Sequence, residues 1–277
     1  MAKPIMIQGT ASGVGKTTLA LALCRIFKQD GYRTAPFKSQ NMTSNAAVLK
    51  MGVELAVSQV LQAKAAGLEP DAAMNPILLK PIPEKNETLL ILNGKPREAV
   101  NAYDFKEIKQ NLLPEIKKAY ETLSSQYDVI VIEGAGSPVE LNLNKNDIVN
   151  MGVAGLAKAP VLLVGGIDRG GVFASLYGTV ALMEESERKH VKATVVNRFK
   201  GDASYFKDGI AILEKITGVP VAGVVPHISI SLPEEDSPGG PEYDPDDDLE
   251  SQFDMIADHV RESLNMDLIY QILEAGV

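Results

Sequence analysis

The chain has 277 residues, 45% of them apolar, which is long enough to bury a substantial core as one large α/β domain. The net charge of −9 comes from residues 234–250, which hold nine carboxylates and no Lys or Arg, so the rest is neutral and a nucleic-acid partner is not expected. Because no apolar run reaches about 18 residues, no leader-like segment opens the chain and the single cysteine allows no disulfide framework, we expect a cytoplasmic protein without a membrane partner.

The first element in chain order is an apolar strand at residues 4–8, followed by the Gly-rich segment 9–18 (GTASGVGKTT) and a helix that begins at Lys16. Such a loop binds phosphate groups, because backbone N–H groups at the start of a helix lack partners. Lys16 would reach the terminal phosphates, and the Thr17 hydroxyl is a candidate ligand of Mg²⁺. The residues that we expect to bind the nucleotide here are Thr10, Gly13, Val14, Gly15, Lys16, Thr17 and Thr18.

A second strand is predicted at residues 34–37, and a helical stretch at residues 52–66. Lys38 follows this strand directly, at the edge of the sheet where ligands bind, so its amine should point toward the phosphates. A second cation beside Lys16 suits phosphoryl transfer to a carboxylate, because the transition state carries negative charge. An ordinary surface lysine is the alternative. The amide-rich run after Lys38 (SQNMTSN) reads either as a turn or as a substrate-binding loop.

Later strands are predicted at residues 128–132, 160–164, 191–196 and 219–225. Short Val/Ile/Leu runs are typical of strands buried on both faces, so we predict a doubly wound, mostly parallel α/β sheet. Glu133 follows one of these strands and is placed to hold Mg²⁺. Asn197 ends another, where it either reads an adenine edge or caps the loop. Arg169 either clamps an anionic group or pairs with Asp168.

Several long strings resemble the cobyric acid synthase family of cobalamin biosynthesis, within the dethiobiotin synthetase-like group of P-loop enzymes. The phosphate loop is similar to the GTxxxxGKT form of that group, since five residues separate Gly9 from Gly15. The other strings run in family order between residues 4 and 226: FKSQNM, MNPILLKP, VIEGAGSPVELNL, DIVNMGVA, IDRGGVFA and VVNRFKGD.

The resemblance implies amidation of peripheral carboxylates of cobyrinic acid a,c-diamide to give cobyric acid, with ATP and Mg²⁺, through acyl phosphates that ammonia attacks. Lys16, Lys38 and Glu133 would be catalytic, and Asn197 would touch the adenine. The metal ligands would be Thr17, Glu133 and Glu54. The residues that would face the corrinoid are Gln40, Asn41, Asn75, Asn142, Asn150 and Arg169.

We expect three parts: a P-loop synthetase core (residues 1–233), an acidic loop (234–250) that we interpret as solvated from its charge, and a helical element (251–277) packed on the core. The helical element is also indicated by the spacing of Phe253, Ile256 and Val260. Family members normally continue into a glutaminase domain. We therefore expect a fragment, a subunit served by a separate glutaminase chain, or an enzyme that uses free ammonia. The sequence does not decide between a monomer and a homodimer.

Two positions depart from the family pattern: Met51 stands where an Asp is usual, and Gly166 replaces the first acid of DIDRGG. These departures keep alternatives open. The chain could activate another carboxylate, as dethiobiotin synthetase or cobyrinic acid a,c-diamide synthase does. It could also be an ATPase switch, or a corrinoid-binding homologue that does not amidate.

Overall fold

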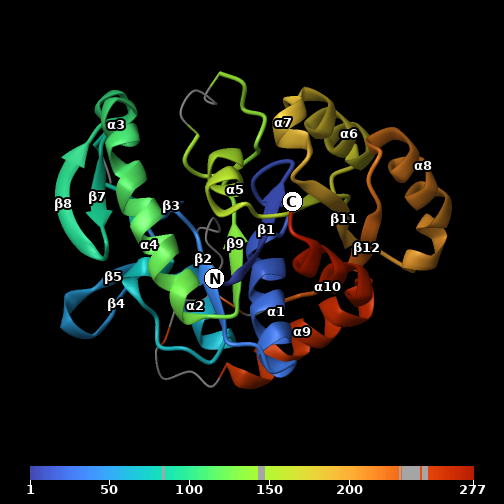
Figure 1. Cartoon of the computed structure of the whole chain (residues 1–277), viewed down its shortest axis with the longest axis horizontal. Coiled ribbons are helices and arrows are strands. Elements are labelled where there is room, and N and C mark those ends of the chain that lie inside the picture. The colour runs from blue at the N-terminus through green and yellow to red at the C-terminus, as the bar shows by residue number, and fades with distance from the viewer. Residues whose placement is uncertain (83–84, 143–146, 231, 233–243, 245–248) are drawn as a thin grey trace.

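The computed structural model describes residues 1–82, 85–142, 147–230, 232, 244 and 249–277. Figure 1 shows the chain with its elements labelled. Most of the predicted acidic loop, residues 234–250, lies outside the described residues. Within the described ranges, no helix combines the length and the apolar character that crossing a membrane requires.

The central sheet has six strands in the order β12-β11-β10-β1-β9-β2, and every neighbouring pair is parallel. This confirms the predicted doubly wound α/β sheet. The strand predicted at residues 34–37 has those bounds, and the others differ by one to three residues at an end. The six strands are β1 (Lys3–Gly9), β2 (Thr34–Phe37), β9 (Val129–Glu133), β10 (Val161–Gly166), β11 (Val191–Phe199) and β12 (Val221–Pro226).

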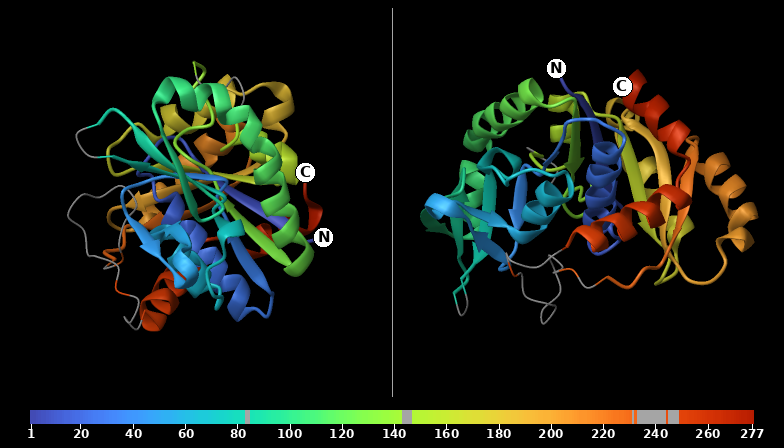
Figure 2. Two further views of the ribbon diagram at one scale, coloured as in Figure 1. Left: turned by 90° about the vertical axis from the view of Figure 1, so that its left-hand side faces the viewer. Right: turned by 90° about the horizontal axis from the view of Figure 1, so that it is seen from below.

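Helices cover both faces of the central sheet. Successive residues of a strand point to opposite faces, so the strands contribute apolar side chains to a helical layer on each side. Ile5 and Ile7 pack in one apolar cluster with α1, α2, α9 and α10, whereas Met6 packs in a second cluster with α4, α5, α6 and α8. The two helical layers are visible in Figure 2. The helices of the first layer are α1 (Lys16–Gln29), α2 (Val57–Ala65), α9 (Glu250–Ser263) and α10 (Met266–Ala275). Those of the second are α4 (Leu113–Gln126), α5 (Met151–Ala157), α6 (Val172–Leu182) and α8 (Lys207–Thr217).

A second, outer sheet lies beside the central one, and our reading of the sequence did not predict it. Its order is β3-β6-β7-β8, with β3 and β6 parallel and the other pairs antiparallel. A short hairpin, β4 with β5, precedes α2, so the predicted helical stretch 52–66 begins as a strand. These strands are β3 (Gln40–Met42), β4 (Ala46–Val48), β5 (Glu54–Ala56), β6 (Ile77–Pro81), β7 (Thr88–Leu92) and β8 (Lys95–Val100). Two further short helices are α3 (Ala102–Ile108) and α7 (Glu185–Arg188).

The final helices, α9 and α10, are tied to α1. Arg25 on α1 forms ion pairs with Glu250 and Asp254 on α9, and Arg261 pairs with Asp30 at the end of α1. The helical pattern predicted after residue 251 is divided into two helices: α9 ends at Ser263, Leu264 is extended, and the side chain of Asn265 caps the start of α10. The predicted three-part division of the chain stays a prediction.

Candidate functional site

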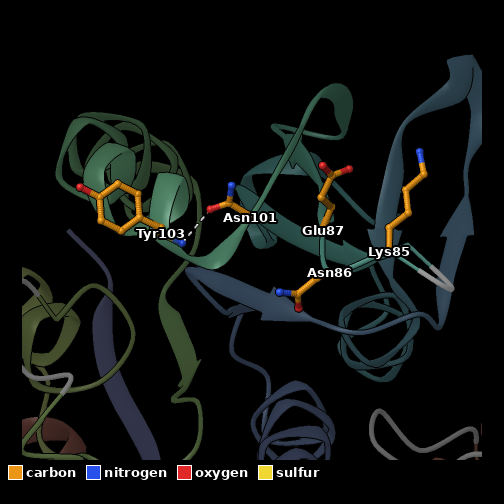
Figure 3. A pocket seen from close by; sticks show the side chains of 5 residues that line it. All are labelled: Lys85, Asn86, Glu87, Asn101 and Tyr103. Atoms are coloured by element: carbon orange, nitrogen blue, oxygen red, sulfur yellow. Dashed lines mark hydrogen bonds between the residues drawn. The ribbon is translucent and has the colours of Figure 1, made fainter.

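A hollow of about 700 Å³ on the outer sheet is lined by Lys85, Asn86, Glu87, Asn101 and Tyr103 (Figure 3). Its lining is exposed except for Asn101, which is half-buried. Asn101 accepts a hydrogen bond from the backbone N–H of Tyr103, as the cap of α3. None of these five lining residues is a buried charged group, so the hollow lacks the side chains that a catalytic site needs.

The phosphate-loop segment forms the expected strand, loop and helix. β1 ends at Gly9 and α1 begins at Lys16. Gly13 and Gly15 have φ angles of +71° and +95°, a region that side chains rarely adopt. No side chain caps the start of α1, so its N–H groups face the loop. The Lys16 amine donates to the carbonyl oxygens of Ala11 and Gly136, at 2.9 and 3.1 Å, and so folds back over the loop.

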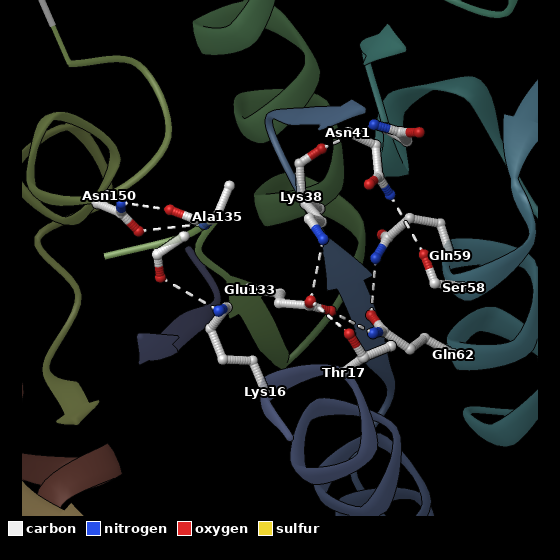
Figure 4. A network of polar contacts seen from close by, with 12 residues as sticks. Lys16, Thr17, Lys38, Asn41, Ser58, Gln59, Gln62, Glu133, Ala135 and Asn150 are labelled. Atoms are coloured by element: carbon white, nitrogen blue, oxygen red, sulfur yellow. Dashed lines mark hydrogen bonds and ion pairs between the residues drawn. The ribbon is translucent and has the colours of Figure 1, made fainter. Parts of the chain in front are cut away.

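The carboxylate of Glu133 lies at the centre of a buried polar network beside this loop (Figure 4). Its Oε1 accepts hydrogen bonds from the Thr17 hydroxyl at 2.8 Å and from the Lys38 amine at 3.0 Å. Its Oε2 accepts one from the Gln62 amide at 2.6 Å. The side chains of Lys38 and Glu133 are 4% and 1% exposed. The structure therefore brings together Thr17, Lys38 and Glu133, which come from α1, from the end of β2 and from the end of β9.

The surroundings of Glu133 favour its ionised form. Burial raises the pKa of the carboxyl group, but the charge of Lys38 and the hydrogen bonds from Thr17 and Gln62 outweigh it and hold the pKa below its ordinary value. An anionic carboxylate next to a threonine hydroxyl is an all-oxygen donor set. Such a set fits Mg²⁺, which proteins bind through one or two carboxylates together with substrate phosphates.

The ion-pair partner of Glu54 lies outside this network. It lies on β5 and pairs with Lys80 on β6, at 2.5 Å between amine and carboxylate. Within the described ranges, no three His, Cys, Asp or Glu side chains group in a way that could hold a metal. Glu133 is the predicted metal ligand that the structure places against Thr17, and a metal-binding role of Glu54 stays a prediction.

The amides predicted to face a substrate fall into two groups. Asn75 donates to the carbonyl oxygens of Lys38 and Ile77, at 3.1 and 3.0 Å. Asn150 donates to the carbonyl of Ala135 and accepts from its N–H, which holds the loop that follows Glu133. These contacts fix the backbone beside the two charged groups, and a substrate contact by either residue stays a prediction.

The other predicted substrate residues keep polar atoms available. Asn41 donates to the Ser58 hydroxyl at 3.2 Å, while its carbonyl oxygen and that of Gln40 are buried without a hydrogen-bond partner among the described residues. Asn142 and Arg169 are exposed.

Asn197 lies against the phosphate loop. Its amide donates to the Val14 carbonyl at 2.9 Å, and a Cβ on Gly15 would come within 2.1 Å of it. Glycine is therefore required at position 15 by this close approach as well as by its φ angle. A contact of Asn197 with adenine stays a prediction. Asp168 pairs with Arg198, at 3.7 Å, and not with Arg169 as the sequence suggested as one alternative.

The sequence analysis did not identify Gln59 and Gln62 as residues of the site. Gln59 donates to the Gln62 carbonyl at 2.8 Å, and both side chains are fully buried. A signal was present, because two glutamines three residues apart in a helix with many apolar residues (VSQVLQAKA) share one face and need polar partners when that face is buried.

Comparison with known proteins gives the following similarities. The family model for the CobQ/CobB/MinD/ParA nucleotide binding domain matches residues 5–238. The cobyric acid synthase of Ruminiclostridium cellulolyticum is 57% identical over 86% of this chain and 46% of its own length. That of Streptococcus sanguinis is 52% identical over 86% of this chain and 47% of its own length. Among solved structures, the MinC:MinD cell division complex of Aquifex aeolicus matches with a TM-score of 0.43 and 17% identity, over 81% of each chain. This chain spans about half the length of the curated relatives it matches.

Proposed function

Because the chain belongs to the family of CobQ/CobB/MinD/ParA nucleotide binding domains, we propose that it uses ATP and Mg²⁺ to activate peripheral carboxylates of cobyrinic acid a,c-diamide for amidation. The substrate class is inferred from the cobyric acid synthases, which are more than half identical to this chain over most of its length. The observation that carries the chemistry is the convergence of Lys38 and Glu133 on the phosphate loop, where Thr17 contacts the same carboxylate.

In this proposal the loop and the start of α1 bind the triphosphate through backbone N–H groups, and Asn197 would contact the base. Thr17 and Glu133 would hold Mg²⁺, which neutralises charge on the phosphates when it is bound. The Lys16 amine exchanges its carbonyl partners for phosphate oxygens. Lys38, which is charged and buried, is the group that allows an anionic carboxylate to approach an anionic phosphate.

The reaction then has two steps. A carboxylate oxygen of the corrinoid attacks the γ-phosphorus, the bond to the β-phosphate oxygen breaks, and ADP leaves. Ammonia attacks the carbon of the acyl phosphate, phosphate departs, and one proton is released from nitrogen. The chain's own contribution is position and charge, because phosphoryl transfer needs little covalent help from the protein. The ammonia would come from a separate glutaminase or from solution.

The experiment combines the purified chain with ATP, Mg²⁺, ammonium chloride and cobyrinic acid a,c-diamide, and follows amide formation by mass spectrometry. We expect stepwise replacement of acid by amide, and ATP hydrolysis that depends on added corrinoid. Lys16→Ala should abolish both while circular dichroism stays unchanged. Lys28→Ala, at the far end of the same helix, is the matched control and should keep activity. Turnover retained in Lys16→Ala, or hydrolysis indifferent to corrinoid, would contradict the proposal.

A further inference from the structure

Gln62 reaches the catalytic centre from a helix outside the phosphate-loop motif. It lies on α2, its side chain is fully buried, and its amide donates to Oε2 of Glu133 at 2.6 Å. Thr17 and Lys38 donate to the other oxygen, Oε1. The two oxygens of the carboxylate therefore have different partners, and Gln62 contacts the oxygen that Thr17 and Lys38 do not.

The orientation of the Gln62 amide is determined by its neighbours. Its carbonyl oxygen accepts from Gln59 at 2.8 Å, so the donors run in one direction, from Gln59 to Gln62 to Glu133. A flipped amide at Gln62 would bring its oxygen against an anionic carboxylate and its NH₂ group against that of Gln59. Both contacts are repulsive, so only one orientation satisfies the chain of hydrogen bonds.

We propose that Gln62 is a positioning residue, which fixes the carboxylate of Glu133 so that its Oε1 faces Thr17 and can bind Mg²⁺ together with ATP; this inference rests on the proposed function. A carboxylate that binds a metal is oriented by the groups hydrogen-bonded to it. In the proposed reaction Thr17 would also contact Mg²⁺, and Lys38 would also face the reacting anions, when the nucleotide is bound. The hydrogen bond from Gln62 involves neither of them, so it holds Glu133 in place before and after that change.

The test measures nucleotide binding instead of turnover. A fluorescent ATP analogue is titrated into the chain at increasing Mg²⁺ concentrations, and in EDTA without Mg²⁺. Gln62→Met removes the donor and keeps much of the side-chain volume. We expect the half-saturating Mg²⁺ concentration to rise about 10- to 100-fold, as for other residues that orient metal ligands. Metal-free binding of the analogue should stay within about twofold, because the phosphate loop itself is unchanged. Gln126→Met, at an exposed position of α4, is the control and should match the unaltered chain.

An Mg²⁺ requirement that is the same in folded Gln62→Met as in the unaltered chain would overturn the inference. So would an equal loss of metal-free and Mg²⁺-dependent binding, because that is what a merely structural role predicts. If Gln62→Met does not fold, Gln62→Asn, whose amide is one methylene short of Glu133, is measured in the same way and judged by the same results. If the unaltered chain itself shows no Mg²⁺-dependent binding, the proposed function fails together with this inference.

Discussion

Replacing Lys38 by Met tests the buried ion pair on which the site depends. The amine and the carboxylate of Glu133 are 3.0 Å apart, and their side chains are 4% and 1% exposed. Removing one partner of a buried pair costs about 3–5 kcal/mol of unfolding free energy, because the other charge stays buried. Thr17 and Gln62 continue to donate to Glu133, so we expect the lower end of this range, about 3 kcal/mol. In a chain of this size that corresponds to a fall in Tm of roughly 10 °C.

The assay is a double-mutant cycle by urea denaturation in the absence of nucleotide, with Lys38→Met, Glu133→Gln and both together. The double variant should be less destabilised than the sum of the single variants by about 1 kcal/mol or more, because it leaves no buried charge unpaired. Lys117→Met is the surface control. Its pair with Glu121 is exposed, so it should cost no more than about 0.5 kcal/mol. Single losses that add within about 0.5 kcal/mol would refute the reasoning.

Two further predictions concern the loop and the periphery. Gly15→Ala should weaken nucleotide binding about tenfold or more, because its Cβ would lie 2.1 Å from the Asn197 amide and its φ is +95°. Gly13→Ala should weaken it less in the same titration, since no atom lies within 4 Å of its Cβ; equal losses would argue against the close contact. The hydrogen bond from Arg33 lowers the pKa of Asp128 to about 2 from 3.8, so this pair stabilises the fold fully above about pH 4 and is lost as the pH falls through 2. The Tm difference between Asp128→Asn and the unaltered chain should be constant from pH 7 to 5 and shrink below pH 4, and a difference independent of pH would show that this titration is not its cause.

The sequence predicted the central sheet well, because each of its strands is a local apolar run. VIVI (129–132) and PVLLV (160–164) are buried on both faces and can be identified from the local sequence alone. The positions of Lys38 and Glu133 followed from the same logic, since parallel strands bring their carboxyl ends to one edge. Strand ends and the phosphate loop together were enough to place the two charged groups next to Thr17.

The outer sheet could not be predicted in this way. β3 and β4 have three residues each, and β3 pairs with β6, which lies more than thirty residues further along the chain. β8 (KPREAV) is mostly exposed and carries charged residues that do not mark a strand. Gln62 was missed for a related reason. Its partner, Glu133, is 71 residues away along the chain, and the sequence of the helix does not indicate which distant residue Gln62 contacts.

The chain passes from the central sheet to the outer sheet through two residues, Lys38 and Ser39, between the end of β2 and the start of β3. This junction is fastened on both sides: the Lys38 N–H bonds to the carbonyl of Met74, and the Ser39 hydroxyl bonds to that of Ile148. The lysine that faces Glu133 therefore lies at the junction of the two sheets, where hydrogen bonds hold the backbone. The distance between its amine and the carboxylate therefore depends on the backbone of both sheets, although the residue itself belongs to neither.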